Sequence, residues 1–325
     1  MTPHRLAALA LTAAAALLPL AAAAQVKWDL PSGYGPNTFQ VQNLQQFAAD
    51  VDAATGGKLK ITLHPGASLF KANEIKRAVQ TQQVQIGEFI VSGSANENPL
   101  FGVDSIPFLA TSYAQARKLD AASRPALDKL LGRQGMKLLY TVPWPPQSLY
   151  SKAPVKALAD LKGTKMRAYN PATTRIAELI GAQPVTIQLA ELPQALATGT
   201  VQNFLTSSAS GVDSKLHEQV SHFYAVAAWL PRNIVVVNRE AFDALDAATR
   251  AAVEKAAAEA GERGWRTSEQ KDGEYLKALE AAGMTVDRDP VALKQELQSI
   301  GARMTDEWLE KAGPEGRAVI DAYRR

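Results

Sequence analysis

The chain has 325 residues, which is enough for two domains of ordinary size. Its 35 Lys+Arg and 32 Asp+Glu residues nearly balance, so nothing in the composition favours a nucleic-acid-binding surface. It contains no cysteine, which excludes disulfides, zinc–thiolate sites and cysteine nucleophiles.

Residues 1–24 have the pattern of a secretion signal. Met1–Arg5 is a short basic start, Leu6–Leu20 is an apolar run, and Ala22–Ala24 is a small-residue cleavage site. The apolar run is short and alanine-rich for a membrane span, although an uncleaved anchor is the alternative. With no cysteine after it, a lipid anchor is excluded. We therefore expect a periplasmic protein without stable membrane insertion.

Strand and helix patterns alternate at the start of the mature chain. Residues 26–30 alternate in polarity and predict a strand, and residues 31–37 form a turn-rich loop. A helix is expected over 38–55 and a second alternating strand over 59–64. Asn37, in the loop, is a candidate for hydrogen bonding to a ligand. This order is typical of an α/β domain.

The next predicted strand carries a carboxylate. A helix is expected over 73–82 and a strand over 84–91, with Glu88 between apolar neighbours. A buried carboxylate needs a partner, so Glu88 is either paired within the protein or directed into a ligand cleft. The sequence leaves both possibilities open.

Two segments are candidates for links between lobes. Residues 143–147 (PWPPQ) follow a predicted strand over 136–142, and the stacked prolines make a stiff, extended link into a strand over 148–151. Residues 227–233 lead into an apolar strand over 234–238 that should cross back. Asn233, at its start, either faces the gap between the lobes or caps the strand end.

The central part of the chain predicts a parallel sheet. Strands alternate with helices there: strands over 165–169, 185–187 and 201–206, a helix capped by Thr173 or Thr174, and a helix over 192–198. Connections of this kind place loops at the carboxyl ends of parallel strands, where ligands bind.

Arg167 lies on the first of these strands. Its guanidinium offers a planar fork of donors that matches a carboxylate. The alternative is a solvated arginine, or one that pairs with a nearby acidic residue. Trp144, Tyr169, Phe204 and Trp229 are candidates for apolar cleft walls, with packing in the core as the alternative for each.

The last third of the chain is rich in helix. Residues 239–282 predict a long helical run with Asp246 as a cap, residues 284–286 a short edge strand, and residues 290–320 two further helices. A coiled-coil dimer helix is disfavoured because the run lacks a sustained apolar heptad.

Three spaced blocks carry a family resemblance. Residues 154–167 (PVKALADLKGTKMR), 181–185 (GAQPV) and 195–201 (ALATGTV) resemble the DctP-type solute-binding proteins of TRAP transporters, over essentially the whole mature chain. The resemblance implies that Arg167, in the "DLKGxKxR" block, clamps the carboxylate of the substrate. It also implies a monomer whose partners are a small organic acid and the TRAP membrane permease subunits.

The resemblance further implies an α/β, two-lobed periplasmic-binding-protein-like fold. Each lobe is a mixed sheet flanked by helices, and a long helix spans both. Residues 25–146 plus 230–265 are expected in lobe I and residues 147–229 plus 266–325 in lobe II. The ligand cleft lies between them.

The sequence departs from the best-known pattern at two places. Gln147 stands where sialate-type members carry a second arginine, and Leu205 and Thr206 fall on the Glu-Asn of the "VDGxEN" block. One guanidinium beside neutral groups argues against a dicarboxylate. We expect a compact monocarboxylate: a cyclic amide acid such as pyroglutamate, whose amide meets Glu88, Gln147 or Asn233, or a keto or hydroxy acid.

The function expected is therefore that of a receptor, not an enzyme, with no cofactor and no metal. A receptor that reports to a histidine kinase is one alternative, and a periplasmic hydrolase is another. The hydrolase reading lacks a Gly-x-Ser-x-Gly motif, a histidine in triad order and a metal-ligand spacing.

Overall fold

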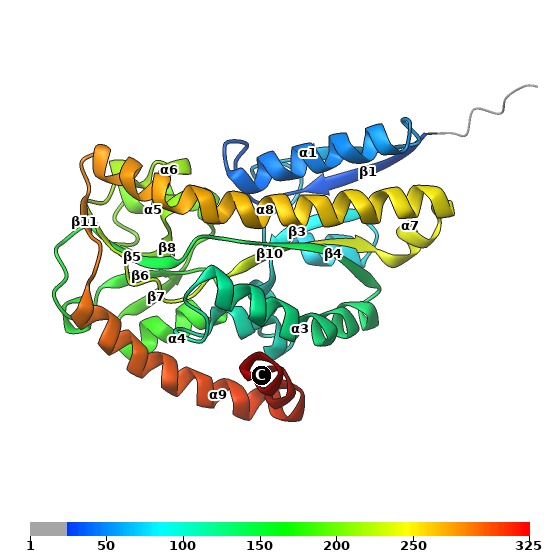
Figure 1. The fold of residues 1–325 in the computed structure, drawn as a ribbon. Coiled ribbons are helices and arrows are strands. Elements are labelled where there is room, and N and C mark those ends of the chain that lie inside the picture. Colours follow the sequence, from blue (N-terminus) through cyan, green and yellow to red (C-terminus); the bar gives the residue numbers. More distant parts are fainter. Residues whose placement is uncertain (1–24) are drawn as a thin grey trace, which may run out of the picture.

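The computed structural model describes residues 25–325, and the predicted secretion signal at residues 1–24 lies outside the described residues. Two groups of strands lie side by side along the long axis of the molecule, and helices cover their outer faces (Figure 1). The predicted α/β architecture with mixed sheets in two lobes is confirmed.

Lobe I contains a parallel pair of strands beside an antiparallel sheet of order β3-β10-β4. A single parallel bridge between Ser32 and Glu88 joins the two. The strands are β1 (Val26–Pro31), β2 (Leu59–His64), β3 (Ile86–Ile90), β4 (Met136–Pro143) and β10 (Arg232–Asn238). The helices are α1 (Phe39–Ala54), α2 (Ile75–Gln80), α3 (Tyr113–Arg133) and α7 (Arg239–Asp243), with 3-10 helices at Val91–Ser94 and Pro99–Ser105.

Lobe II is built on one mixed sheet of order β11-β9-β5-β8-β6-β7. Its strands are β5 (Gln147–Ser151), β6 (Lys165–Ala168), β7 (Gln183–Thr186), β8 (Asn203–Ser207), β9 (His222–Tyr224) and β11 (Thr285–Asp287). Its helices are α4 (Pro171–Ile180), α5 (Leu192–Ala197) and α6 (Ser208–Asp213), with 3-10 helices at Leu158–Leu161, Leu189–Glu191 and Leu216–Glu218. β6 is parallel to both β7 and β8, as the central βαβαβ pattern predicted.

Helix α4 corrects one detail of the prediction. Its N-cap is Asn170, whose side chain accepts from the Thr173 backbone N–H, while the Thr173 hydroxyl interacts with the Asn170 backbone N–H. The expectation that Thr173 or Thr174 caps the helix is wrong. Asn170 takes the position because Pro171 is suited to the first helical turn, where its missing N–H is not needed.

Two of the connections between the lobes are extended segments, and they hydrogen-bond to each other. β4 continues through Trp144 into β5, and the chain returns from β9 to β10. The Trp144 backbone N–H donates to Pro231 O at 2.8 Å, and the Gln147 N–H donates to Trp229 O at 2.8 Å. The crossover at residues 143–147 therefore lies where the proline-rich sequence predicted it, within a two-stranded connection.

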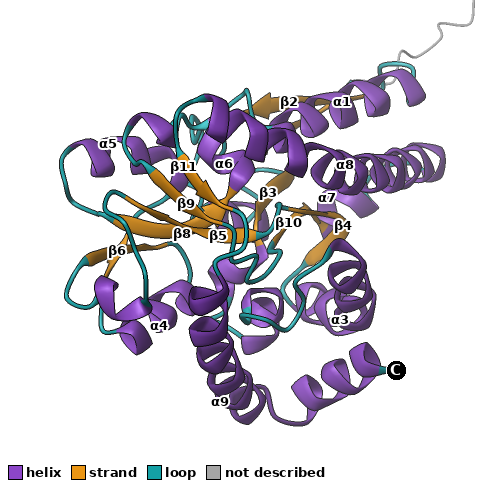
Figure 2. Ribbon diagram, turned by 60° about the vertical axis from the view of Figure 1, so that its left-hand side comes forward, coloured by secondary structure: helices purple, strands orange, loops and turns teal. Residues whose placement is uncertain are grey.

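Two long helices reach across both lobes (Figures 1 and 2). α8 (Ala247–Ala281) is capped by Asp246 and packs against α1 and β4 in lobe I and against α6 in lobe II. α9 (Val291–Arg324) turns sharply at Gly313, where φ is 58°. Before this turn, α9 packs in the core of lobe II through Leu297 and joins the lobe I cluster around Leu100 through Trp308.

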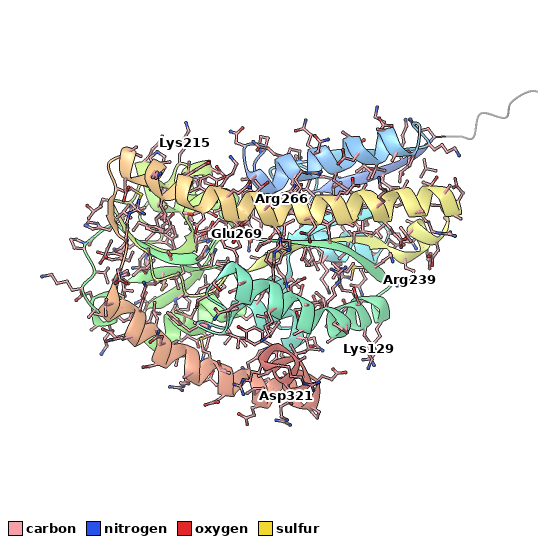
Figure 3. All side chains as sticks on the ribbon, in the orientation of Figure 1. Lys129, Lys215, Arg239, Arg266, Glu269 and Asp321 are labelled. Carbon is pink, nitrogen blue, oxygen red and sulfur yellow. The ribbon has the colours of Figure 1, made fainter. Side chains whose placement is uncertain are left out.

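Charged side chains project from the outer surface, as Lys129, Lys215, Arg239 and Asp321 illustrate (Figure 3). Within residues 25–325, no helix is both long enough and apolar enough to cross a membrane.

Two glycines of α8 allow its packing to be tested. A Cβ at Gly264 would lie 2.5 Å from Val142 Cγ2, whereas a Cβ at Gly273 would meet nothing within 4 Å. We predict that Gly264→Ala lowers the free energy of unfolding by about 1–3 kcal/mol through overpacking. Gly273→Ala should raise it by about 0.5–1 kcal/mol through helix propensity. Urea denaturation measures both, and a neutral Gly264→Ala would contradict the close approach of α8 to β4.

Candidate ligand-binding site

Arg167 is a buried arginine without an acidic partner. It lies on β6, beside β7 and β8, and is 3% exposed. Its Nε donates to Ile187 O at 2.9 Å, and its guanidinium lies 4.8 Å from the centre of the Tyr169 ring. Within the described chain, Nη1 and Nη2 make no hydrogen bond and no ion pair. Two donor groups on one edge of the guanidinium are therefore free for a ligand.

The charge of Arg167 persists at neutral pH. Burial lowers its pKa to about 10, while Tyr169 and Tyr34 act weakly in the opposite direction. A buried cation without a counter-ion is costly, because it has lost water and gained no equivalent partner. The site therefore favours an anion.

The guanidinium borders a cavity of about 40 Å³ that both lobes line. Arg167 is the one charged residue among the described residues of its wall. The wall from lobe I consists of Gly33, Tyr34, Ala72, Ile90, Trp144 and Pro231. The wall from lobe II consists of Gln147, Arg167, Tyr169, Gln188, Leu189, Thr206 and Ser210.

The lobes touch beside this cavity. The Asn170 side chain, which caps α4 in lobe II, donates to Ser92 Oγ at 2.9 Å and to Ser105 Oγ at 3.3 Å. Both serines belong to 3-10 helices of lobe I. The same amide thus begins a helix and ties the lobes together.

A wider groove of about 680 Å³ adjoins the cavity and shares Ala72, Ile90, Tyr169 and Gln188 with it. Lys76, Arg77 and Arg175 lie along the groove, but Arg167 does not. The groove therefore borders the cavity, and the smaller cavity contains the group that matches a carboxylate.

The structure brings together five of the residues that the sequence proposed for the cleft. They are Arg167, Gln147, Tyr169, Thr206 and Trp144, and all line the cavity. Tyr169 and Gln147 are also in contact, because the Tyr169 hydroxyl lies 3.3 Å from Gln147 Oε1.

The other proposed residues do not line the cavity. Phe204 stacks on Tyr150 in the core of lobe II, with 4.8 Å between ring centres. Trp229 is 1% exposed and packs in a second core cluster of lobe II. Asn37 lies on an exposed turn before α1.

Glu88 and Asn233 lie one layer behind the cavity. Asn233 Nδ2 donates to Glu88 Oε1, and Ser32 Oγ donates to the second Glu88 oxygen at 2.7 Å. Burial raises the pKa of Glu88 to about 7, against the lowering effect of these two donors. Glu88 is paired within lobe I, which was one of the two alternatives the sequence left open.

Sequence reasoning missed three polar residues that lie shortly after strand ends and line the cavity. Tyr34 follows β1, Gln188 follows β7, and Ser210 follows β8. The available signal was their position just after the carboxyl ends of strands, since the ligands of α/β folds bind at such ends.

The structure has two α/β lobes joined by paired crossovers, and the cavity between them favours an anion. These features define a two-lobed ligand-binding receptor. Residues 32–311 match the DctP model, bacterial extracellular solute-binding protein, family 7, and the chain belongs to this family. It is a solute-binding receptor of the TRAP type, as the sequence blocks predicted.

Three solved structures are similar over nearly the whole chain. DctP6 of Bordetella pertussis, an extracytoplasmic solute receptor binding pyroglutamic acid, is 52% identical with a TM-score of 0.91, covering 92% of this chain and 99% of its own. DctP7 of Bordetella pertussis, which also binds pyroglutamic acid, is 45% identical with a TM-score of 0.91, covering 92% and 100%. A marine metagenome TRAP solute-binding protein specific for pyroglutamate is 46% identical with a TM-score of 0.90, covering 92% and 99%.

The raised pKa of Glu88 predicts a pH dependence of stability. Because the folded-state pKa of about 7 exceeds the ordinary value of 4.5, the folded state binds this proton more tightly. The resulting stabilisation is complete below about pH 4.5 and is lost as the pH rises through about 7.

Glu88→Gln should remove this contribution, which is at most roughly 3 kcal/mol for the shift between those pKa values. Asp104 and Asp213, whose pKa values burial raises to about 6, affect both proteins equally. The measurement is the free energy of unfolding from pH 4 to 8. Parallel curves for the wild type and the variant would show that folding does not shift the pKa of Glu88.

Proposed function

We propose that this protein captures pyroglutamate, or a closely related cyclic amide monocarboxylate, in the cavity between its lobes. The observation that carries the proposal is the buried guanidinium of Arg167, whose Nη1 and Nη2 are free on the cavity side. Receptors that are 45–52% identical and bind pyroglutamate support the choice of ligand. A keto or hydroxy acid of similar size is the second candidate, because it too would place one carboxylate on Arg167.

The electrostatics of the cavity favour a single negative charge on the ligand. A carboxylate can accept two parallel N–H bonds from a guanidinium, and such charge-assisted pairs are the strongest hydrogen bonds in proteins. The remaining polar side chains of the wall are neutral, among them Gln147, Gln188 and Thr206. A second carboxylate would be buried against them without compensation.

Capture follows from closure of the lobes. In this proposal residues 25–146 plus 230–265 form one unit and residues 147–229 plus 266–325 form the other, with the end of α9 from Trp308 onward packed on the first unit. They close about the paired crossovers, as hinge-type binding proteins do. The ring of the ligand then lies among Trp144, Tyr34 and Tyr169, and closure excludes water from the Arg167–carboxylate pair. The protein acts in the periplasm as a monomer, has no catalytic role, and delivers its ligand to a TRAP permease.

The carboxylate contact is tested by Arg167→Ala. Removing one partner of a buried, hydrogen-bonded charge pair costs about 2–5 kcal/mol, which corresponds to a roughly 30-fold to several-thousand-fold loss of affinity. Isothermal titration calorimetry with L-pyroglutamate measures this loss. Arg288→Ala is the control, because Arg288 is an exposed lobe II arginine that pairs with Glu280. Unchanged affinity of Arg167→Ala would refute the assignment.

The ligand class is tested by thermal shift. A ligand at 100 times its Kd stabilises the folded state by about 2.7 kcal/mol, which raises the melting temperature measurably. Cyclic amide and small hydroxy monocarboxylates should produce this shift, and succinate and sialic acid should not. Stabilisation by dicarboxylates or sialic acid alone would overturn the proposal.

A further inference from the structure

The hydrogen bonds behind the cavity have a fixed direction. The Trp144 indole N–H can only donate, and it lies 2.9 Å from Asn233 Oδ1. That atom must therefore be the carbonyl oxygen of the Asn233 amide, since the NH₂ group could not accept this bond. The amide nitrogen then faces Glu88, whose oxygen accepts from it. Trp144 and Glu88 together hold the Asn233 side chain in one orientation.

This orientation determines what Tyr34 offers to the cavity. The Tyr34 hydroxyl lies 3.3 Å from the same Asn233 Oδ1. A carbonyl oxygen only accepts, so the single proton of Tyr34 is directed to Asn233. The phenol oxygen keeps its lone pairs, and toward a ligand it acts as an acceptor. A ligand group that can only accept would bind Tyr34 only if the Tyr34 hydroxyl turned its proton away from Asn233.

Tyr34 holds a distinct position among the residues that line the cavity from lobe I. Gly33, Ala72, Ile90 and Pro231 contribute no polar side-chain atom, and the Trp144 N–H is already bonded to Asn233. On the other side, Arg167 in lobe II can only donate. Tyr34 is therefore the one side chain of the lobe I wall that can accept a hydrogen bond from a ligand, and it lies across the cavity from the Arg167 donors.

Tyr169 has a similar polarity on the lobe II side. Gln147 Nε2 donates to Pro145 O at 3.1 Å, which directs Gln147 Oε1 toward the Tyr169 hydroxyl and engages the Tyr169 proton. Tyr169 lies on the same segment as Arg167 and stacks on its guanidinium. A bond to Tyr169 therefore does not join the lobes, whereas a bond to Tyr34 does.

We propose that Tyr34 is a specificity-determining residue whose oxygen accepts a hydrogen bond from an N–H or O–H group of the ligand, across the cleft from the carboxylate on Arg167. The inference rests on the proposed function, since it concerns the same cavity. It selects acids that carry a donor, such as lactam and hydroxy acids. It disfavours lactone and keto acids, whose corresponding atom has only lone pairs.

The test compares two ligands that differ in one group. L-pyroglutamate has a ring N–H, and 5-oxotetrahydrofuran-2-carboxylate, its lactone analogue, has a ring oxygen at that position. In the unmodified protein we expect the lactone to bind roughly 30-fold or more weakly by calorimetry, because two acceptors then face each other in a buried site. Equal affinity for the two ligands would overturn the inference and leave the proposed function standing.

The variant Tyr34→Phe assigns the effect to one residue. It should weaken pyroglutamate binding about tenfold or more and should not weaken lactone binding, because the facing acceptor is removed, so the preference falls to within about threefold. Tyr169→Phe is the matched control and should keep the preference. If the preference survives Tyr34→Phe and disappears in Tyr169→Phe, the acceptor lies in lobe II and the inference is wrong. The comparison of ligands on the unmodified protein stands even if a variant folds poorly.

Failure of the proposed function gives a different result. If pyroglutamate does not bind the unmodified protein, the ligand assignment is wrong. The affinities of lactate and pyruvate then test whether Tyr34 prefers ligands that carry a hydrogen-bond donor. Both acids have a carboxylate. Lactate carries a hydroxyl group that can donate, whereas pyruvate carries a keto oxygen that can only accept. A preference for pyruvate would overturn the role of Tyr34, and a preference for lactate would support it.

Discussion

The buried positive charge of Arg167 is the constraint on which the rest of the site depends. A guanidinium that has lost its water requires compensation, and within the described chain it receives one carbonyl, Ile187 O, and the face of Tyr169. The sheet makes this position possible, because β6 has a parallel neighbour on each side that fixes its backbone. The compensation that is missing is the kind that a bound carboxylate supplies, so the fold is completed by its ligand.

The polar groups around this charge are arranged in layers. Those nearest the cavity belong to tyrosine, glutamine and threonine side chains, and those behind them are tied to one another. The Trp144–Asn233–Glu88–Ser32 chain of hydrogen bonds leaves little freedom for any member to turn. Fully satisfied buried networks of this kind rigidify their surroundings. The network therefore holds Trp144 and the partner of Tyr34, two parts of the cavity wall, in fixed positions.

The order of strands and helices could be predicted from the sequence, and so could the candidacy of Arg167 as a ligand contact, because both depend on local pattern. Residues 165–206 alternate between strand and helix signals, and the blocks around Arg167 resemble a known family closely. The position of Tyr34 in the cavity wall could not be predicted. It lies in a loop of glycine and proline whose path is determined by contacts with distant segments, such as its bond to Asn233. Glu88 could not be assigned either, because its partner Ser32 is brought to it by a bridge between β1 and β3 that no local pattern encodes.

α9 has a mechanical consequence. Its first part is embedded in the core of lobe II through Leu293 and Leu297, and its later part is embedded in lobe I contacts through Trp308 and Ile320. The helical segment from Leu293 to Trp308 is anchored in both lobes, so it cannot stay fixed in both while they separate. Opening must bend this segment or move one of its anchored ends, and either movement disturbs apolar packing on the side of the molecule opposite α8 (Figure 1). The packing of α9 thus limits the amplitude of opening, independently of what the cavity contains.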